Sequence, residues 1–428
     1  MSFRYLLKEA DMTKFALNRD HAIIILSVLV QVPLAIFLGH YYDERSFMDS
    51  GYLVASGLNP YVPHVINVFS PYFVGVNPVT GDPPLWPLLL GLIYKLTYNI
   101  TPNIFFYNFA TKLPIIAGNI GLAYIVKKIL GQQGASERKM RFAWLFLLFN
   151  PFILLTSAAW GQFDTLIALL CIGSLYLLSK GMVAKSSTLL SLSVVLKPIS
   201  FPLLGLPLLF SPKRSIRQVL IYVAISVTLI AALWILPFYL LGWIIPASST
   251  QATSFFTRAG GLSLFSILEL LKNQVTLPSN LQLLGYLWVP ALLIGYYFVY
   301  RDQPRTFTEL TQKAACIMLI FFLTFSWVSE PYFNVLIPLV LVSFPLSKIN
   351  FRNFHFLWVI PLIFMIVTTN FFQLFFLVWP HVISSLALFD QQFRTWRLFA
   401  RFVIVIIFQI FAWILLVQMF KRNKNSER

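Results

Sequence analysis

Long apolar runs constrain the fold of this chain more than any other feature. Runs of roughly 17 to 25 mostly apolar residues recur from Ala22 to Phe420, and each is long enough to cross the hydrocarbon core of a membrane as an α-helix. With 58% hydrophobic and only 11% charged residues among 428, the chain lacks the polar surface of a soluble domain. We therefore predict an all-α, polytopic membrane helix bundle of about 11–12 hydrophobic crossings or hairpins. Residues 22–420 form its single integral domain, between tails at 1–21 and 421–428.

The distribution of basic residues predicts the orientation of the bundle. When the N-terminus is placed in the cytoplasm, 23 of the 32 Lys and Arg residues fall in tails and short loops on the cytoplasmic side. By the positive-inside rule both termini are then cytoplasmic. The net charge of +17 is spread over these short loops rather than gathered on one soluble face, which argues against nucleic acid as a partner.

The first outer loop, at about 40–84, is the most polar part of the chain. Ser46 and Asp49 have the spacing of a capping box, and Gly57 follows as a stop signal. We expect a short interfacial helix there. The apolar run Leu85–Leu96 is short for a span and is predicted to enter the membrane without crossing it. Further outer loops are predicted at about 242–280 and 371–398.

Prolines interrupt two of the later apolar runs. Asn150-Pro151 is expected to break one span near its outer end, and Asp164 is expected to begin the next. The run Thr188–Phe210 has basic residues at both of its ends, so both ends are predicted to be cytoplasmic. The LKPISFP sequence in its middle predicts a re-entrant or two-helix hairpin with Lys197 at the tip.

Polar residues gather on the predicted outer side although they are scattered along the chain. A carboxylate beside an interfacial cavity can deprotonate a hydroxyl, and a basic side chain can hold a lipid phosphate. Each residue also has a structural interpretation: a span end, a helix start, a cap, a headgroup anchor, or, for Lys197, snorkelling to the interface. The residues are Asp43, Glu44, Asp49, Asp82, Asp164, Lys197, Arg258 and Glu330.

Motifs for soluble cofactors are absent from the sequence. There is no Walker lysine motif, no G-x-G-x-x-G after a strand and no H-E-x-x-H. A donor for group transfer is therefore expected to be carried by a lipid rather than by a soluble nucleotide. No cofactor or metal site is assigned, and the involvement of a divalent cation stays open.

Five motifs occur in an order that resembles the multi-spanning glycosyltransferase C superfamily, most of all GPI mannosyltransferase I and its prokaryotic relatives. The likeness covers about Ala22 to Leu346. It implies a glycosyltransferase C-like fold and an inverting transferase that moves mannose or another hexose from dolichyl or polyprenyl phosphate to an acceptor hydroxyl on the non-cytoplasmic face. The motifs are MDSGYLVASGLNPY, DPPLWPLL, NPFILLTSAAWGQFDTL, LKPISFPLL and VSEPYFNVLIPL.

The resemblance also implies roles for individual residues. Asp43 matches the final acid of the superfamily's catalytic D-x-D, whose first acid is missing here, and is expected to take the proton of the acceptor hydroxyl. Arg258 and Lys197 are expected to stabilise the departing lipid phosphate. The predicted substrate-binding residues are Asp49, Asp82, Asp164, Lys197, Arg258, Glu330 and Tyr332. The predicted partners are a lipid-phosphate-linked sugar, a lipid or glycan acceptor and membrane lipids.

Two other classes of protein fit the same hydrophobicity. A transporter or lipid flippase needs many spans and a polar cavity, but it typically shows paired halves and charges near the midplane, which are not apparent here. A non-catalytic subunit of a membrane complex is the third alternative.

Overall fold

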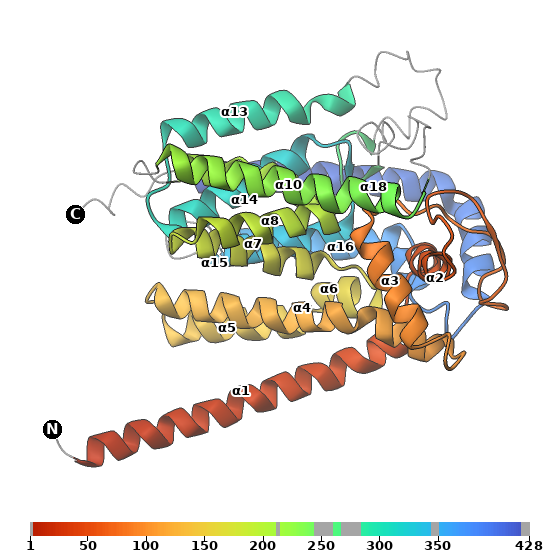
Figure 1. Ribbon diagram of the computed structural model, residues 1–428, viewed down its shortest axis with the longest axis horizontal. Coiled ribbons are helices and arrows are strands. Elements are labelled where there is room, and N and C mark those ends of the chain that lie inside the picture. Colours follow the sequence, from red (N-terminus) through yellow and green to blue (C-terminus); the bar gives the residue numbers. More distant parts are fainter. Residues whose placement is uncertain (1–2, 211–214, 244–259, 267–283, 344–350, 421–428) are drawn as a thin grey trace.

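The computed structural model describes residues 3–210, 215–243, 260–266, 284–343 and 351–420 (Figure 1). It is a helix bundle whose long axes run in the same general direction. The bundle helices are α1 (Phe3–Phe37), α4 (Ile104–Gln132), α5 (Glu137–Phe149), α7 (Asp164–Ser179), α8 (Val183–Leu196), α10 (Ile216–Leu240), α13 (Trp288–Arg301), α14 (Phe307–Thr324), α15 (Phe333–Ser343), α16 (Phe351–Val367) and α18 (Val382–Phe420).

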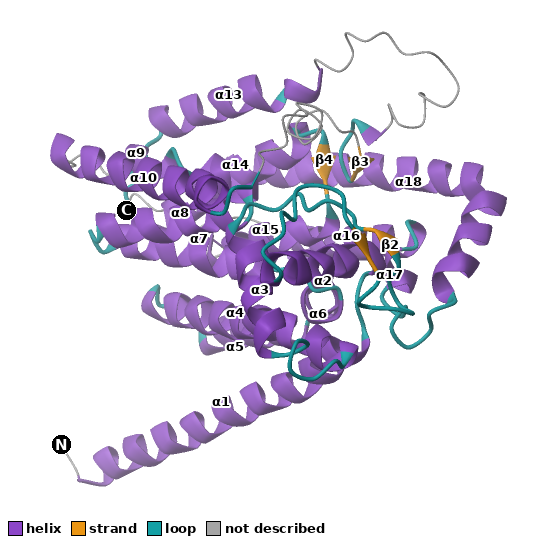
Figure 2. Ribbon diagram, turned by 45° about the vertical axis from the view of Figure 1, so that its right-hand side comes forward, coloured by secondary structure: helices purple, strands orange, loops and turns teal. Residues whose placement is uncertain are grey.

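Short elements connect these helices (Figure 2). Two tiny sheets lie at one end of the bundle, an antiparallel pair of β1 (Val65–Ile66) and β2 (Gly75–Val76) and a parallel pair of β3 (Gly260–Gly261) and β4 (Trp327–Val328). The remaining helices are α2 (Tyr41–Ala55), α3 (Leu85–Leu96), α6 (Pro151–Leu154), α9 (Leu206–Leu209) and α17 (Asn370–Gln373), with a π-helix at Leu155–Ala159 and 3-10 helices at Pro198–Leu203 and Glu330–Tyr332.

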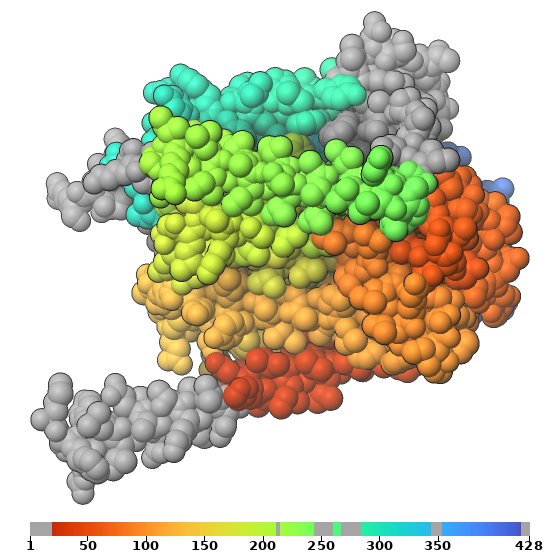
Figure 3. Space-filling model, in the orientation of Figure 1, coloured from red at the N-terminus to blue at the C-terminus, as the bar shows by residue number. Residues whose placement is uncertain are grey.

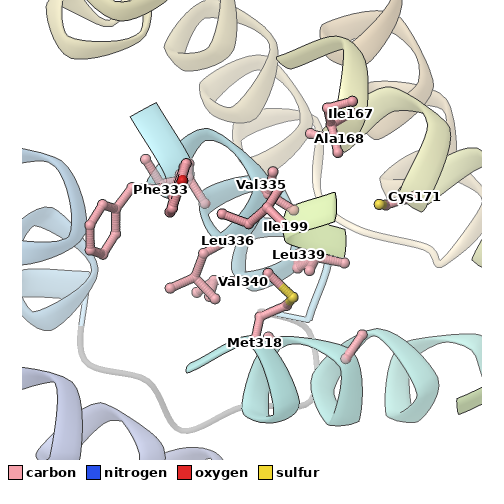
Figure 4. Close-up of a cluster of buried hydrophobic side chains, with 14 of the residues drawn as sticks. Ile167, Ala168, Cys171, Ile199, Met318, Phe333, Val335, Leu336, Leu339 and Val340 are labelled. Atoms are coloured by element: carbon pink, nitrogen blue, oxygen red, sulfur yellow. The ribbon is translucent and has the colours of Figure 1, made fainter. Parts of the chain in front are cut away.

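The centre of the bundle is α15, in which every residue is buried. A helix that is apolar on all sides must be covered on all sides, and α15 packs against α4, α7, α14 and α16. Figure 4 shows the contact region, where Val335, Leu336 and Leu339 of α15 lie near Met318 of α14 and Ile167 of α7. This core extends through the bundle and supports the outer elements that carry polar residues.

Six helices among the described residues are long and apolar enough to cross a membrane, so the prediction of a polytopic all-α membrane bundle is confirmed. Shorter apolar helices complete the bundle. The six spans are Arg19–Phe37, Ile104–Gln132, Glu137–Ala159, Ile216–Leu240, Phe307–Thr324 and Val382–Phe420.

The helix α2 lies across the end of the bundle and is seen end-on in Figure 1. Together with α3 and the loop between them it covers that end, as the orange surface in Figure 3 shows. The predicted capping box is wrong: α2 begins at Tyr41, so Ser46 and Asp49 lie within the helix, and His40 is the N-cap residue. The sequence does not indicate that the helix begins at Tyr41, because the N-cap residue His40 makes no side-chain hydrogen bond to the first turn.

The LKPISFP segment turns back on itself. Ser187 of α8 lies within hydrogen-bonding distance of both Tyr222 O and Ser226 Oγ of α10, 2.8 Å each. These contacts join the N-terminal halves of both helices, and α8 and α10 run in the same direction (Figure 1). The chain between them therefore returns along the bundle through the 3-10 helix and α9, and Lys197 lies at the bend.

Two predicted boundaries need correction. The outer segment predicted as a loop at 371–398 is largely helical, because α18 begins at Val382 and continues through a kink at Phe393. The first helix also begins before the predicted tail ends, at Phe3. The break at Asn150-Pro151 and the helix start at Asp164 occur where the sequence predicts them.

Close packing of α2 on its neighbours gives a first prediction. A Cβ at Gly51 would lie 2.1 Å from Tyr107 Oη and 3.0 Å from Leu90 O. We expect Gly51→Ala to lower the free energy of unfolding by about 1–3 kcal/mol, although alanine favours a helix by about 1 kcal/mol over glycine. Gly81→Ala is the control, since a Cβ there meets nothing within 4 Å. Equal thermal midpoints for both variants in detergent would contradict the packing.

Candidate active site

Asp43 lies in the first turn of α2, where the positive end of the helix dipole stabilises a carboxylate. Its side chain is 36% exposed, so one part of it is open while the other is held by neighbours. His40, at the N-cap, stacks on Trp160 with ring centroids 4.1 Å apart. Burial lowers the pKa of His40, against the opposing effect of Asp43.

The π-helix after α6 directs two side chains at Asp43. Trp160 Nε1 and Gln162 Nε2 each donate a hydrogen bond of 2.6 Å to Asp43 Oδ2. Gly161 between them has a φ of +94°, and a Cβ there would come within 3.0 Å of Glu44 Oε2. The left-handed turn thus needs glycine both for its conformation and for space. π-helical turns of this kind often occur at functional sites.

The polar residues around the π-helix hold it in place. Asn119 of α4 donates to Ser157 Oγ at 2.8 Å, and Asn334 of α15 donates to Thr156 Oγ1 at 2.8 Å. Because these two side chains come from two different helices, α4 and α15, the π-helix is hydrogen-bonded to both. The position of Trp160 therefore follows from the buried bundle.

Lys197 extends the site from Asp43 toward α7. Its Nζ donates to Gln162 Oε1 and to Asp164 Oδ2, at 2.7 Å each. Asp164 is fully buried at the start of α7. The ammonium also lies 5.1 Å from the Phe163 ring centroid and 5.2 Å from that of Tyr332, within cation–π range. The structure therefore brings together Asp43, Asp164, Lys197 and Tyr332 from four separate segments.

Asp82 faces the same cluster from the loop before α3. Tyr61 donates a 2.8 Å hydrogen bond to its carbonyl oxygen, which fixes the backbone there. Burial raises the pKa of Asp82 to about 7; Lys197 opposes this rise, and Asp43 and Asp164 add to it. Asp82 is therefore close enough to Lys197, Asp43 and Asp164 to interact with their charges.

Glu330 lies beside the Lys197 cluster and contacts Asn370 rather than Lys197. Its Oε1 accepts a 3.0 Å hydrogen bond from Asn370, and burial raises its pKa. Asn370 also lies beside His40 and raises the pKa of that imidazole. Glu330 is therefore connected to the Asp43 region through Asn370 and His40.

Asp49 lies apart from this cluster. Asp49 is fully buried and pairs with Arg45, whose Nε lies 3.5 Å from Asp49 Oδ2. Arg45 also donates to Val74 O and Val76 O, so the pair holds the loop containing β2. Six residues of helix turn Asp49 away from Asp43, and its role in binding substrate stays a prediction. Arg258 lies outside the described residues.

Sequence reasoning missed the groups that position Asp43. Trp160 and Gln162 were visible only as part of a turn. Glu44 was noticed as an outer acid, but its buried partner Lys112 was not; Nζ of Lys112 lies 3.3 Å from Glu44 Oε2. A lysine inside the apolar run FATKLPII was the available signal, since a charge there demands a partner.

No group of three or more His, Cys, Asp or Glu side chains suited to a metal ion occurs within the described ranges. The site offers instead a half-exposed carboxylate, a hydrogen-bonded ammonium and aromatic rings at one end of a membrane bundle. That combination suits a membrane enzyme that handles a hydroxyl and a phosphate.

Comparisons with known proteins agree with this class. Residues 5–211 match the family described as alpha-(1->6)-mannopyranosyltransferase, N-terminal domain. The crystal structure of ArnT from Cupriavidus metallidurans bound to undecaprenyl phosphate is similar over 94% of this chain and 76% of that one, with a TM-score of 0.50 and 15% sequence identity. No curated protein matches the chain. The chain shares the fold of that structure, in agreement with the glycosyltransferase C-like fold that its motifs predict.

The buried pair of Glu44 and Lys112 gives a second prediction. Lys112→Met leaves Glu44 buried without its cation, and we expect a loss of about 3–5 kcal/mol in unfolding free energy. Adding Glu44→Gln to it should restore most of the loss. Lys127→Met is the control, because the pair of Lys127 with Asp20 is partly exposed and worth about 0–1 kcal/mol. If the midpoints of unfolding in detergent fall equally in Lys112→Met and Lys127→Met, the assignment of Glu44 and Lys112 as a buried ion pair is wrong.

Proposed function

We propose that the protein transfers a hexose, most simply mannose, from a polyprenyl or dolichyl phosphate to a hydroxyl of a lipid-linked or glycolipid acceptor, with inversion at the anomeric carbon. The observation that carries the proposal is the arrangement of Asp43 and Lys197 on the two ends of the Gln162 side chain. A base and a cation are thereby placed next to one another at one end of the bundle. The mannosyltransferase description of the matching family favours mannose, and the undecaprenyl phosphate of ArnT favours a lipid-phosphate donor.

Asp43 acts as the general base. Its Oδ2 is occupied by Trp160 and Gln162, and the part of the carboxylate that stays open accepts the proton of the acceptor hydroxyl. The hydroxyl oxygen then bonds to the anomeric carbon as the bond from that carbon to the phosphate oxygen breaks. Such a base contributes on the order of 10² to 10⁴ in rate.

Lys197 stabilises the leaving phosphate. Its ammonium has three donors, of which two are used by Gln162 and Asp164. The third is available to the lipid phosphate, whose negative charge grows as the glycosidic bond breaks. Arg258 is proposed to assist from the second outer loop.

The other polar residues bind the sugar and the acceptor. Asp82 and Tyr332 border the cluster around Lys197, and Glu330 lines the side reached through Asn370. Asp164 orients Lys197 rather than substrate, because it is fully buried. A chelator added to the transfer assay tests whether a divalent cation takes part.

The orientation of the bundle is proposed from its charges. The C-terminal ends of α4, α7 and α13, which carry Lys127, Lys180 and Arg301, lie at the end of the bundle opposite α2 (Figure 1). By the positive-inside rule that end is cytoplasmic and the site opens on the other side. Cysteine substitutions at Tyr42 and at Lys180 test this: a membrane-impermeant maleimide applied to intact cells should label the first and spare the second.

Removal of the proposed base gives the third prediction. Asp43→Asn should lower the rate of mannose transfer from undecaprenyl-phosphate mannose by about 10² to 10⁴, measured with radiolabelled donor in detergent. Expression and thermal midpoint should stay at the wild-type level, since asparagine keeps the size of the side chain. Asp302→Asn at the opposite end is the control. Near-normal turnover by Asp43→Asn would remove Asp43 from the mechanism.

Removal of the proposed phosphate ligand gives the fourth prediction. Lys197→Met should lower kcat by about 10² to 10³, because one charged stabiliser of the transition state is lost. Lys313→Met is a close control: Lys313 also pairs with an aspartate at 2.7 Å, and its side chain is 11% exposed against 12% for Lys197. If the two variants transfer mannose equally well, Lys197 is not a ligand of the phosphate.

A further inference from the structure

Gln162 is the only described side chain that hydrogen-bonds to both Asp43 and Lys197. It is buried, with 9% of its surface exposed. Its Nε2 is 2.6 Å from Asp43 Oδ2 and its Oε1 is 2.7 Å from Lys197 Nζ. One side chain therefore joins the proposed base to the proposed phosphate ligand.

The chemistry of the two partners fixes which way the amide points. An ammonium has donors only, and an ionised carboxylate has acceptors only. The amide oxygen must therefore face Lys197, and the amide nitrogen must face Asp43. Lys197 also donates to Asp164 at 2.7 Å. The orientation of the Gln162 amide therefore depends on Asp164, the first residue of α7.

This fixed orientation determines which oxygen of Asp43 is free. Trp160 and Gln162 both donate to Oδ2, and the nearest nitrogen of His40, at 3.7 Å, also faces Oδ2. None of these three contacts reaches Oδ1. Because the side chain is 36% exposed, Oδ1 is the oxygen that is left for a substrate.

We propose that Gln162 is a positioning residue: held by Lys197, it donates to Asp43 Oδ2 and so keeps the carboxylate turned with Oδ1 toward the acceptor hydroxyl. The inference rests on the proposed function of Asp43 as the base. It adds that Asp43 and Lys197 are coupled through the amide of Gln162, so that a substitution of either residue alters the position of the other.

Several titratable groups face Asp43 in addition to the neutral amide of Gln162. His40 and Glu44 approach from its own helix. Asp82 approaches from the loop before α3, and Lys197 and Asp164 lie beyond the amide. A test of Gln162 must therefore compare variants in which these groups are unchanged.

The first experiment uses Gln162→Glu, which keeps the shape of the side chain but replaces the donor with a second carboxylate. We expect the pH midpoint of Asp43 ionisation to rise by about one unit or more, because a like charge at hydrogen-bond distance disfavours the ionised form. The readout is carbodiimide labelling of the peptide that carries Asp43, followed by mass spectrometry over a pH series. Gln133→Glu, at the opposite end of the bundle and bonded to Thr308, is the control and should leave the midpoint unchanged.

The second experiment uses Gln162→Met, which keeps the packing and removes both hydrogen bonds. We expect kcat for transfer from undecaprenyl-phosphate mannose to fall about 10²-fold, as for loss of one oriented donor, with KM for the donor changed less than kcat. A side chain that only fills space would leave both constants unchanged. This variant also decides the question if Gln162→Glu does not fold.

The outcomes separate this inference from the proposed function. If the wild type transfers mannose but Gln162→Glu keeps the wild-type labelling midpoint and Gln162→Met keeps the wild-type kcat, the positioning role is wrong and the proposed function stands. If the wild type transfers no hexose from a polyprenyl phosphate while the midpoint shifts, the coupling stands and the proposed function fails. A shifted midpoint together with reduced kcat supports both.

Discussion

The turn from α1 into α2 is the constraint on which the site depends. Within a few residues the chain leaves the direction of the bundle and runs across its end (Figure 1), which exposes the last carbonyl groups of α1. Asn108 of α4 donates to Ala35 O, Ile36 O and Leu38 O at 2.8–3.0 Å. Lys112, one turn further along α4, also donates to Leu38 O. Three carbonyl groups at the turn thereby accept hydrogen bonds from side chains of α4.

Glu44 completes this turn, and its position determines that of Asp43. The Glu44–Lys112 pair is almost fully buried, and Lys112 also donates to Ala159 O at the end of the π-helix at 3.0 Å. Burying a charge pair costs desolvation, and burial raises the pKa of Glu44 to about 7 although Lys112 opposes the rise. The pair therefore contributes specificity more than stability: it joins α1, α2, α4 and the π-helix at one point. Asp43 and Trp160, which meet at 2.6 Å, each lie next to a member of that junction.

The other two carboxylates of α2, Glu44 and Asp49, have surroundings that differ from those of Asp43. Glu44 faces inward to Lys112, and Asp49 faces Arg45 and the loop that Arg45 holds. Asp43 alone among the three is partly exposed and surrounded by neutral donors. The rotation of 100° per residue along a helix separates the buried, paired acids from the partly exposed one, and the position at which the helix starts decides which acid is exposed. The capping-box prediction, with Ser46 rather than His40 as the N-cap, moved that start by six residues and so placed Asp49 in the first turn of the helix.

The sequence by itself determined the membrane bundle, the positions of its proline breaks and the bend at Lys197, because these depend on hydrophobic length and on proline geometry. The order of motifs also predicted Asp43, Asp164, Lys197 and Tyr332 as site residues, and the structure brings these four together. The tertiary structure alone decided that Asp49 turns away, that Lys112 balances Glu44, and that Trp160 and Gln162 hold Asp43. Those contacts join residues up to 119 positions apart, and their geometry depends on a π-helical turn and a glycine with positive φ. Hydrophobic patterns along a chain carry no information about such pairings between distant segments.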